Sequence, residues 1–357
     1  MIWSRIRQHE AQIEMFRRSV QRNRLPHAIL LTGAEGIGKR TFALALAQCL
    51  LCQRFSNDQL DACGECPSCQ SVTAGSHPDL FVVECPEGKR QLPIELFVGS
   101  DDKRGREGLC HDLALSPMAS DRKIAIIDDA DLMNEFSGNA LLKTLEEPPR
   151  NSVLILVSGN PDQLLDTIRS RCQRVRFSRL TDENLASLLV EQGIVEDQTE
   201  AAQIASLAEG SLAYARLLLA PELRSLRSVI DSHFSRIPPN AGQLAADILA
   251  AVDEIGGNTA AQRSTASTAC QFLADFFRAA LRIVSGDAAE SAVPSVASGF
   301  AAQLPGDLED QLELLMGLID RVLQADDQLK QNVTAALCLE AMTADVASQL
   351  RSHSSAR

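Results

Sequence analysis

The strongest constraint on the fold is a series of short apolar segments that alternate with helix-like segments through the first half of the chain. The strand-like segments are AILLTG (28–33), DLFVVE (79–84), KIAIID (123–128), SVLILVS (152–158) and RVRF (174–177). Residues 4–22, 41–51 and 139–147 have the spacing of apolar residues that is typical of helices. Apolar strands that alternate with helices form parallel sheets covered on both faces. We therefore predict an α/β domain over residues 1–180.

After Leu180 the strand-like segments end and the sequence becomes helical. Short helical patterns fill residues 181–218, and longer patterns rich in Ala and Leu follow. A loop rich in Ser, Ala, Gly and Pro at 285–306 precedes a long helical stretch that runs to about residue 350. We therefore predict a small helical domain at 181–218 and an all-α domain at 219–357.

Composition and charge argue against two classes of protein. No run approaches the roughly 18 apolar residues of a membrane helix, and the amino-terminal residues lack the apolar stretch of a signal peptide, so we expect a cytoplasmic protein with no membrane partner. The net charge is −13: residues 1–180 hold 23 of the 34 Lys+Arg and 23 of the 47 Asp+Glu, which leaves 11 and 24 for residues 181–357. A protein that binds DNA by itself usually has a basic surface. We therefore expect any contact with DNA to depend on partners.

A glycine-rich segment directly follows the first strand and opens a helix. It reads GAEGIGKR over residues 33–40, and Gly33, Gly36 and Gly38 would let backbone N–H groups face phosphate oxygens. Lys39 would bind the β- and γ-phosphates at the helix N-terminus. This order of strand, loop and helix predicts a nucleotide-binding fold.

The position after Lys39 breaks the pattern of this loop. A Ser or Thr is needed there because its hydroxyl binds Mg²⁺, but the residue is Arg40, whose guanidinium has no lone pair to offer. Thr41 is adjacent, yet one residue along a helix rotates a side chain by about 100°, so we expect Thr41 not to replace the missing hydroxyl. We therefore expect poor binding of ATP with Mg²⁺, even if the backbone still holds a phosphate.

Two carboxylates, Asp128 and Asp129, lie at the end of the KIAIID strand. An aspartate at such a strand end helps to hold Mg²⁺ in nucleotide hydrolases, and the alternative is a pair of solvated acids. The predicted degenerate nucleotide site consists of Gly33, Gly36, Gly38, Lys39, Thr41, Asp128 and Asp129.

Four of the ten cysteines lie close together in the sequence, as Cys52, Cys63, Cys66 and Cys69. Two consecutive C-x2-C steps place thiolates on a tight turn, and a fourth ligand from the preceding helix end completes a tetrahedral zinc site. Four protein ligands leave no open position, so the predicted role of the zinc is structural. Cys49 is a rival fourth ligand, although its place within the helix favours the core, and four free thiols are the alternative to a metal.

The segment NALLKTLEEPP (139–149), with DDADLMN before it and TIRSRCQ (167–173) after it, resembles the bacterial clamp-loader family of AAA+ proteins. LPHAILLTG (25–33) and SHPDLFVVE (76–84) are similar to the delta-prime branch of that family. The resemblance covers residues 1 to about 218, and the rest only as a helical collar of suitable length. It implies an AAA+ P-loop domain with a parallel sheet and a zinc module at 52–69, a small helical lid domain, and a collar domain for oligomerisation.

The resemblance also implies roles for single residues. Arg171 matches the arginine of the family's Ser-Arg-Cys motif, which reaches as an arginine finger into the ATP site of a neighbouring subunit. Asp129 stands where hydrolysing relatives usually carry Glu, and Ala213 stands where they carry a sensor arginine. Together with Arg40, these departures imply a subunit that has no ATPase activity of its own and donates Arg171 to another.

The implied function is that of a non-hydrolysing clamp-loader subunit in the DNA polymerase III holoenzyme, a DNA-directed DNA polymerase. Its partners would be the ATP-hydrolysing gamma or tau subunits, the delta subunit, the sliding clamp and, through the assembly, primer-template DNA. The alternatives are an active gamma/tau-type ATPase and an independent zinc-dependent nucleic-acid-binding protein. The polar segment at 96–110 is either a lid or a loop without a function.

Overall fold

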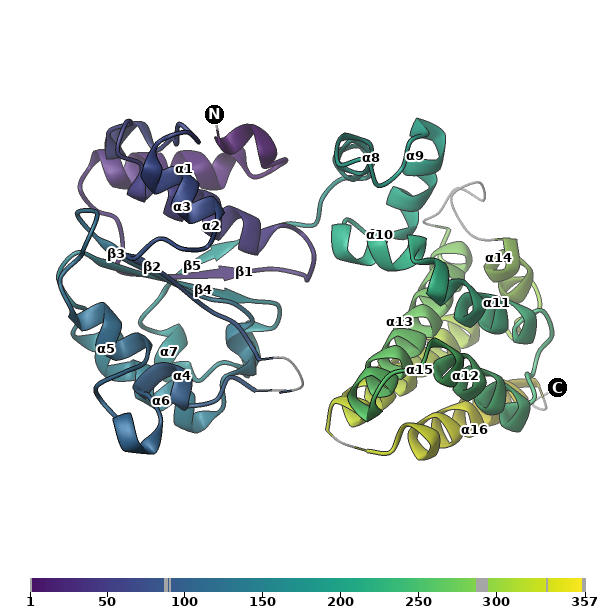
Figure 1. Ribbon diagram of the computed structural model, residues 1–357. Helices are drawn as coiled ribbons and strands as arrows, with labels where there is room; N and C mark the ends of the chain where they lie inside the picture. Colours follow the sequence, from purple (N-terminus) through teal and green to yellow (C-terminus); the bar gives the residue numbers. More distant parts are fainter. Residues whose placement is uncertain (1, 87–88, 90, 287–294, 332, 355–357) are drawn as a thin grey trace. The chain divides into compact units, whose positions relative to one another are not determined.

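The computed structural model describes residues 2–86, 89, 91–286, 295–331 and 333–354 (Figure 1). These residues divide into two compact units, Met1–Tyr214 and Ala215–Arg357. The finer predicted division of the chain, at 180 and at 218, stays a prediction.

The first unit is built around a five-stranded parallel sheet. The strands are β1 (Ala28–Thr32), β2 (Leu80–Val83), β3 (Lys123–Ile127), β4 (Ser152–Ser158) and β5 (Gln173–Arg176), in the order β2-β3-β4-β1-β5. In this register Leu30 of β1 lies opposite Leu156 of β4 and Arg174 of β5. Because all neighbouring strands are parallel, their carboxyl ends meet at one edge of the sheet. Ligands of open α/β sheets bind outside this edge.

Helices cover both faces of the sheet (Figure 1). One face carries α1 (Glu10–Gln21), α2 (Lys39–Leu51) and α3 (Pro67–Thr73), and the other carries α4 (Glu95–Val98), α5 (Leu109–Ala114), α6 (Glu135–Glu146) and α7 (Asp166–Arg169). Successive residues of a strand point to opposite faces. Ile29 and Leu31 therefore join the core beneath α1–α3, whereas Leu30 joins the core beneath α4–α7. Burial on both faces is the reason that β1, β3 and β4 are apolar along almost their whole length.

The first unit also contains α8 (Asp182–Glu191), α9 (Gln198–Leu207) and the beginning of α10 (Leu212–Leu219). Gln8 connects this helical part to the end of the sheet. Its side-chain amide donates to the carbonyl oxygen of Arg179 at 2.7 Å, and its side-chain oxygen accepts from the N–H of Thr181 at 2.5 Å. Short 3₁₀ helices lie at Ile2–Arg5, Asn57–Gln59, Asp101–Lys103, Ala130–Leu132, Pro161–Gln163 and Pro221–Leu223.

In the described residues of the second unit, all regular structure is helical. Its helices are α11 (Arg224–His233), α12 (Ala241–Ile255), α13 (Thr259–Val284), α14 (Ser295–Ala301), α15 (Leu308–Lys330) and α16 (Ala335–Ser354). Aromatic rings form part of its core, with centroids 5.1–5.8 Å apart, and they belong to Phe234, Phe276, Phe277 and Phe300. Across the described residues, none of the helices is both long enough and apolar enough to span a bilayer.

The predicted fold class, a parallel α/β sheet followed by helices, is confirmed. The long helical stretch expected after residue 306 is instead two helices, because the helical structure is interrupted between Lys330 and Ala335. Val333 and Thr334 lie in this break, and β-branched residues are weaker helix formers than the Ala and Leu around them. The predicted loop at 285–306 contains α14, and its residues 287–294 lie outside the described part of the chain.

The polar segment at 96–110 is anchored near both ends. Phe97 and Leu109 are buried in the core beneath α4–α7, whereas residues 100–107 are exposed. Between these anchors Gly105 donates its N–H to the carbonyl oxygen of Val98 at 2.8 Å, which closes the segment into a compact loop. A role as a lid stays a prediction.

Candidate nucleotide site and metal centre

The glycine-rich loop joins the carboxyl end of β1 to the first residue of α2. Gly36 and Gly38 have φ values of 73° and 94°, a region that favours glycine. At Gly33 a Cβ atom would lie 2.5 Å from the carbonyl oxygen of Phe177, so the end of β1 needs a residue without a side chain. The three glycines thus allow the tight turn that the sequence predicts for a phosphate-binding loop.

Lys39 folds back onto this loop. Its side chain is almost fully buried, and its ammonium group donates to the carbonyl oxygens of Gly33 at 2.7 Å and Ala34 at 2.5 Å. Burial lowers the pKa of Lys39, and the nearby carboxylates of Glu35 and Asp131 oppose that shift. A phosphate in the loop would have to compete with two carbonyl groups for the lysine.

Arg40 bridges two carboxylates at the ends of neighbouring strands. Its Nε atom lies 2.8 Å from Oδ2 of Asp128, and its Nη2 atom bonds to Oε1 of Glu84. Glu84 follows β2 and Asp128 follows β3, which are adjacent in the sheet. In a hydrolysing site Mg²⁺ supplies the positive charge that faces such an aspartate. Here an internal guanidinium supplies it, from the position where the motif needs a metal-binding hydroxyl.

The carboxylates at the end of β3 are crowded. Burial raises the pKa of Asp128; the charge of Asp129 adds to the increase, and Arg40 opposes it. Burial likewise raises the pKa of Asp129, with a further contribution from Asp131. Thr41 is exposed on α2, and the expectation that it does not replace the missing hydroxyl stays a prediction. Arg40 opposes both of these pKa increases, and Lys39 opposes that of Asp129.

The beginning of α10 contacts the glycine-rich loop directly. The N–H of Leu212 donates to the carbonyl oxygen of Gly36 at 2.9 Å. A Cβ atom on Gly36 would lie 2.2 Å from Oγ of Ser211 and 2.7 Å from Cβ of Ala213. Ala213, which occupies the expected position of a sensor arginine, thus lies against the loop, and its methyl group contributes no charge there.

Arg171 does not contact the glycine-rich loop; its partners lie in α6 and α7. Its Nη2 atom lies 2.6 Å from Oε1 of Glu146 in α6, and its Nη1 atom donates to the carbonyl oxygen of Thr167 at 3.0 Å. Its neighbours are anchored: Ile168 is fully buried, and the partly buried Cys172 packs against the same core. Arg171 is therefore a partly exposed cation on a fixed segment.

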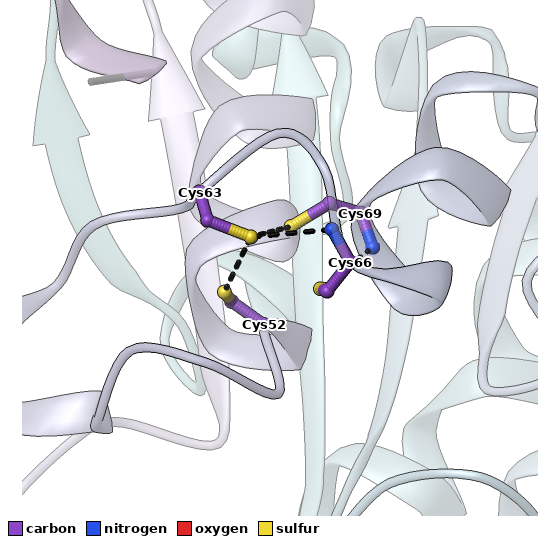
Figure 2. Close-up of side chains that lie close together, drawn as sticks. All are labelled: Cys52, Cys63, Cys66 and Cys69. Atoms are coloured by element: carbon purple, nitrogen blue, oxygen red, sulfur yellow. Dashed lines mark hydrogen bonds between the residues drawn. The ribbon is translucent and has the colours of Figure 1, made fainter.

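The four predicted metal ligands converge beside the end of α2 (Figure 2). The sulfur of Cys63 lies 3.8 Å from that of Cys52 and 3.9 Å from that of Cys69, and all four sulfurs, with Cys66, lie within 4.8 Å of one another. A zinc ion with Zn–S bonds of about 2.3 Å has ligand sulfurs about 3.8 Å apart at the corners of a tetrahedron. The spacing of the sulfurs therefore fits a metal ion with four thiolate ligands.

Backbone N–H groups donate to two sulfurs of this cluster, whereas burial raises the pKa of a third thiol, that of Cys69. The N–H of Cys66 donates to the sulfur of Cys63 at 3.3 Å, and that of Cys69 donates to the sulfur of Cys66 at 3.4 Å. Burial opposes ionisation of Cys66, but hydrogen bonds from Cys69 and the backbone of Gln53 outweigh it and lower the pKa of Cys66 to about 6. Cys49 lies outside the group of four, and burial raises its pKa. The cluster could therefore hold a metal ion without Cys49.

Sequence reasoning missed Glu84 and Glu146. Glu84 ends the strand-like segment DLFVVE, so a search for carboxylates at strand ends could have found it. Glu146 lies within NALLKTLEEPP, but nothing in its spacing links it to Arg171.

Comparison with known proteins finds relatives that are named as subunits of DNA polymerase III. Residues 8–181 match a family described as DNA polymerase III, delta subunit. The delta-prime subunit of DNA polymerase III from Pseudomonas aeruginosa is 43% identical over 146 residues (41% of each chain), and that from Bacillus subtilis is 35% identical over 176 residues (49% of each chain). The delta-prime subunit from Yersinia pestis is 30% identical over 242 residues, or 66% of each chain.

The chain thus spans about half or less of the length of the first two of these relatives. A solved structure of a gamma subunit-related protein of DNA polymerase III from Thermotoga maritima is 21% identical, with a TM-score of 0.46, over 95% of this chain and 100% of that one. The family match covers the sheet and its helices, and parts of the chain are 30–43% identical to curated delta-prime subunits from different bacteria. The chain belongs to the family of DNA polymerase III delta-prime subunits.

Proposed function

We propose that this chain is a clamp-loader subunit that does not hydrolyse ATP and that donates Arg171 to the ATP site of a neighbouring subunit. Its relatives are named as delta-prime, gamma and tau subunits of DNA polymerase III. Its partners would be ATP-hydrolysing gamma or tau subunits, the delta subunit and the sliding clamp. Primer-template DNA would be contacted through the assembly, because the net charge of −13 disfavours strong binding of DNA by the isolated chain.

The ion pairs of Arg40 carry this proposal. A nucleotide-bound Mg²⁺ needs oxygen ligands, and Arg40 supplies none while its guanidinium neutralises Asp128 and Glu84. A metal ion would have to displace a bonded cation and would gain no hydroxyl in return. Asp129 and Ala213 weaken the site further, because they stand in place of the expected catalytic glutamate and sensor arginine.

The alternative is an active gamma/tau-type ATPase, and it requires a site that holds ATP with Mg²⁺. The distinguishing measurement is calorimetry of the isolated chain with ATP, with and without Mg²⁺, together with an assay of ATP turnover. We expect no gain in affinity from Mg²⁺ and no turnover above background. Brisk turnover by the isolated chain would favour the alternative.

The donor role of Arg171 is tested in the assembled complex. An arginine finger can contribute about 10³–10⁵ to the rate of the site that it serves. Arg171→Ala should leave assembly intact and lower the ATPase activity that DNA and clamp stimulate. Unchanged turnover in a fully assembled complex would contradict the finger role.

We also propose that the metal of the four-cysteine cluster is zinc and that its role is structural. Thiolates prefer soft or borderline metals such as zinc. Four protein ligands would leave no position for water or substrate. The zinc would fix α3, which contains Cys69, to the end of α2, where Cys52 lies.

A further inference from the structure

The segment NALLKTLEEPP has no part in the function proposed above, yet the structure connects it to the arginine finger. Glu146, in the last turn of α6, belongs to this segment, and its Oε1 atom lies 2.6 Å from Nη2 of Arg171. The two residues come from different sequence motifs, and the fold brings them into one ion pair.

Close packing of α6 against α7 sets the distance between the two residues. Gly138 of α6 faces α7, and a Cβ atom there would lie 2.8 Å from Cδ1 of Leu165 and 3.3 Å from Cδ1 of Ile168. The start of α6 is fixed by Asn134, whose side chain accepts from the N–H of Ser137 at 3.0 Å. Since Ile168 is fully buried, the backbone that carries Arg171 is tied to the same core as α6.

The ion pair restrains the guanidinium of Arg171 without occupying all of it. A guanidinium has five N–H donors. Nη2 binds Glu146, while Nη1 donates to the carbonyl oxygen of Thr167 at 3.0 Å and to Oγ of Ser170 at 3.4 Å. Within the described residues Nε has no acceptor, so donors remain for an oxyanion supplied from outside the protomer.

Arg169, two residues earlier at the end of α7, has more carboxylate partners than Arg171. It is bound by the carboxylates of both Asp162 and Asp166 and also donates to the carbonyl oxygen of Pro161 at 3.4 Å. Arg171 has one carboxylate partner instead of two. The arrangement therefore holds Arg171 in place while leaving charge for a second anion.

We infer that Glu146 is a positioning residue, which orients Arg171 before the chain meets the nucleotide of a neighbouring subunit. This inference rests on the donor role proposed for Arg171. Ordering a free arginine side chain has an entropic cost, and a bond formed in the free protomer removes part of that cost from the transition state. Glu146 acts through Arg171 and does not itself contact the nucleotide.

The test uses the assembled complex and the part of its ATP turnover that depends on Arg171, which is the native rate minus the rate with Arg171→Ala. The two side chains of the ion pair are 37% and 50% exposed, so the effect should be modest. Glu146→Ala should lower the kcat of the Arg171-dependent part about two- to fivefold, as for an exposed ion pair, with KM for ATP unchanged. Glu146→Gln keeps an acceptor oxygen and should restore most of the loss.

Asp162→Ala is the matched control, because it removes an exposed carboxylate that binds the nearby Arg169 and not Arg171, and it should leave turnover unchanged. The double variant Glu146→Ala/Arg171→Ala should be no slower than Arg171→Ala alone. If Arg171→Ala has no effect, the donor role itself fails. If Arg171→Ala slows turnover but Glu146→Ala leaves it unchanged or raises it, the donor role stands and the positioning role of Glu146 is wrong.

Discussion

Replacing Arg40 by serine would remove a guanidinium from the site and supply a hydroxyl that can bind Mg²⁺. Serine is a residue that the phosphate-loop motif uses at this position. In the variant, Asp128 and Glu84 would lose the guanidinium that binds them both. We expect Arg40→Ser to be less stable than the native chain at neutral pH and to regain stability when Mg²⁺ is added.

The size of this loss follows from the geometry of the site. Unit charges about 4 Å apart attract by about 1 kcal/mol in water and by about 4 kcal/mol at an effective dielectric constant of 20. Arg40 is 48% exposed and Asp128 is 15% exposed, so the attraction lies between these limits. Ordering an arginine side chain offsets up to about 2 kcal/mol of it. The expected loss is about 1–2 kcal/mol.

The pH dependence of this loss has a definite sign. Burial already raises the pKa of Asp128, and removing Arg40 takes away an influence that lowers it. A carboxyl group whose folded pKa is raised contributes stability below its unfolded pKa of about 3.9 and loses it as pH rises through the folded pKa. The difference between variant and native chain should therefore be full at neutral pH and shrink as pH falls toward about 4.

The assay is the free energy of unfolding from urea titrations with and without Mg²⁺. Mg²⁺ at about ten times its dissociation constant would restore about 1.4 kcal/mol to Arg40→Ser, and the native chain should not respond. Arg18→Ser is the control, because it removes a surface arginine that pairs with Glu14 on α1, away from the loop. Equal responses to Mg²⁺ in Arg40→Ser and the native chain would refute the idea that Arg40 occupies the place of the metal.

Two further predictions concern structural groups. The native chain should contain about one zinc per molecule, and Cys66→Ser/Cys69→Ser should lose it; a metal-free native protein, measured by elemental analysis, would contradict the zinc site. The carboxylate of Asp79 accepts hydrogen bonds from the N–H groups of Met118, Ala119 and Ser120 at 2.7–2.9 Å. Burial opposes ionisation of this carboxyl group, but the hydrogen bonds outweigh burial and lower its pKa. Asp79→Asn should therefore cost about 1–3 kcal/mol of unfolding free energy, a difference that is full above pH about 3.9 and disappears as pH falls through the lower folded pKa; a loss independent of pH would show that the charge is not its cause.

The architecture of the first unit was predictable because its strands are buried on both faces. Such strands must be apolar along their length, so segments such as SVLILVS stand out from any amphipathic helix of the same chain. Boundaries were less predictable. The helix expected at 139–147 begins at Glu135, because Asn134 caps it with its side chain, and the helical stretch after residue 306 is interrupted near Val333.

The sequence by itself determined which chemical groups are present and where the motif departs from a working nucleotide site. The sequence alone shows Arg40 after Lys39, Ala213 near the end of the first unit, and four cysteines with metal-ligand spacing. Each has a consequence that follows from the side chain alone, since a guanidinium cannot act as a ligand for Mg²⁺ in any fold.

Only the tertiary structure decided which groups face one another. Arg40 meets Glu84, 44 residues later, because β2 and β3 are adjacent and end at the same edge of the sheet. Glu146 meets Arg171 because Gly138 lets α7 approach α6 closely. Such pairings depend on strand order and helix packing, which arise from the collective burial of apolar surface, and no local pattern of residues encodes them.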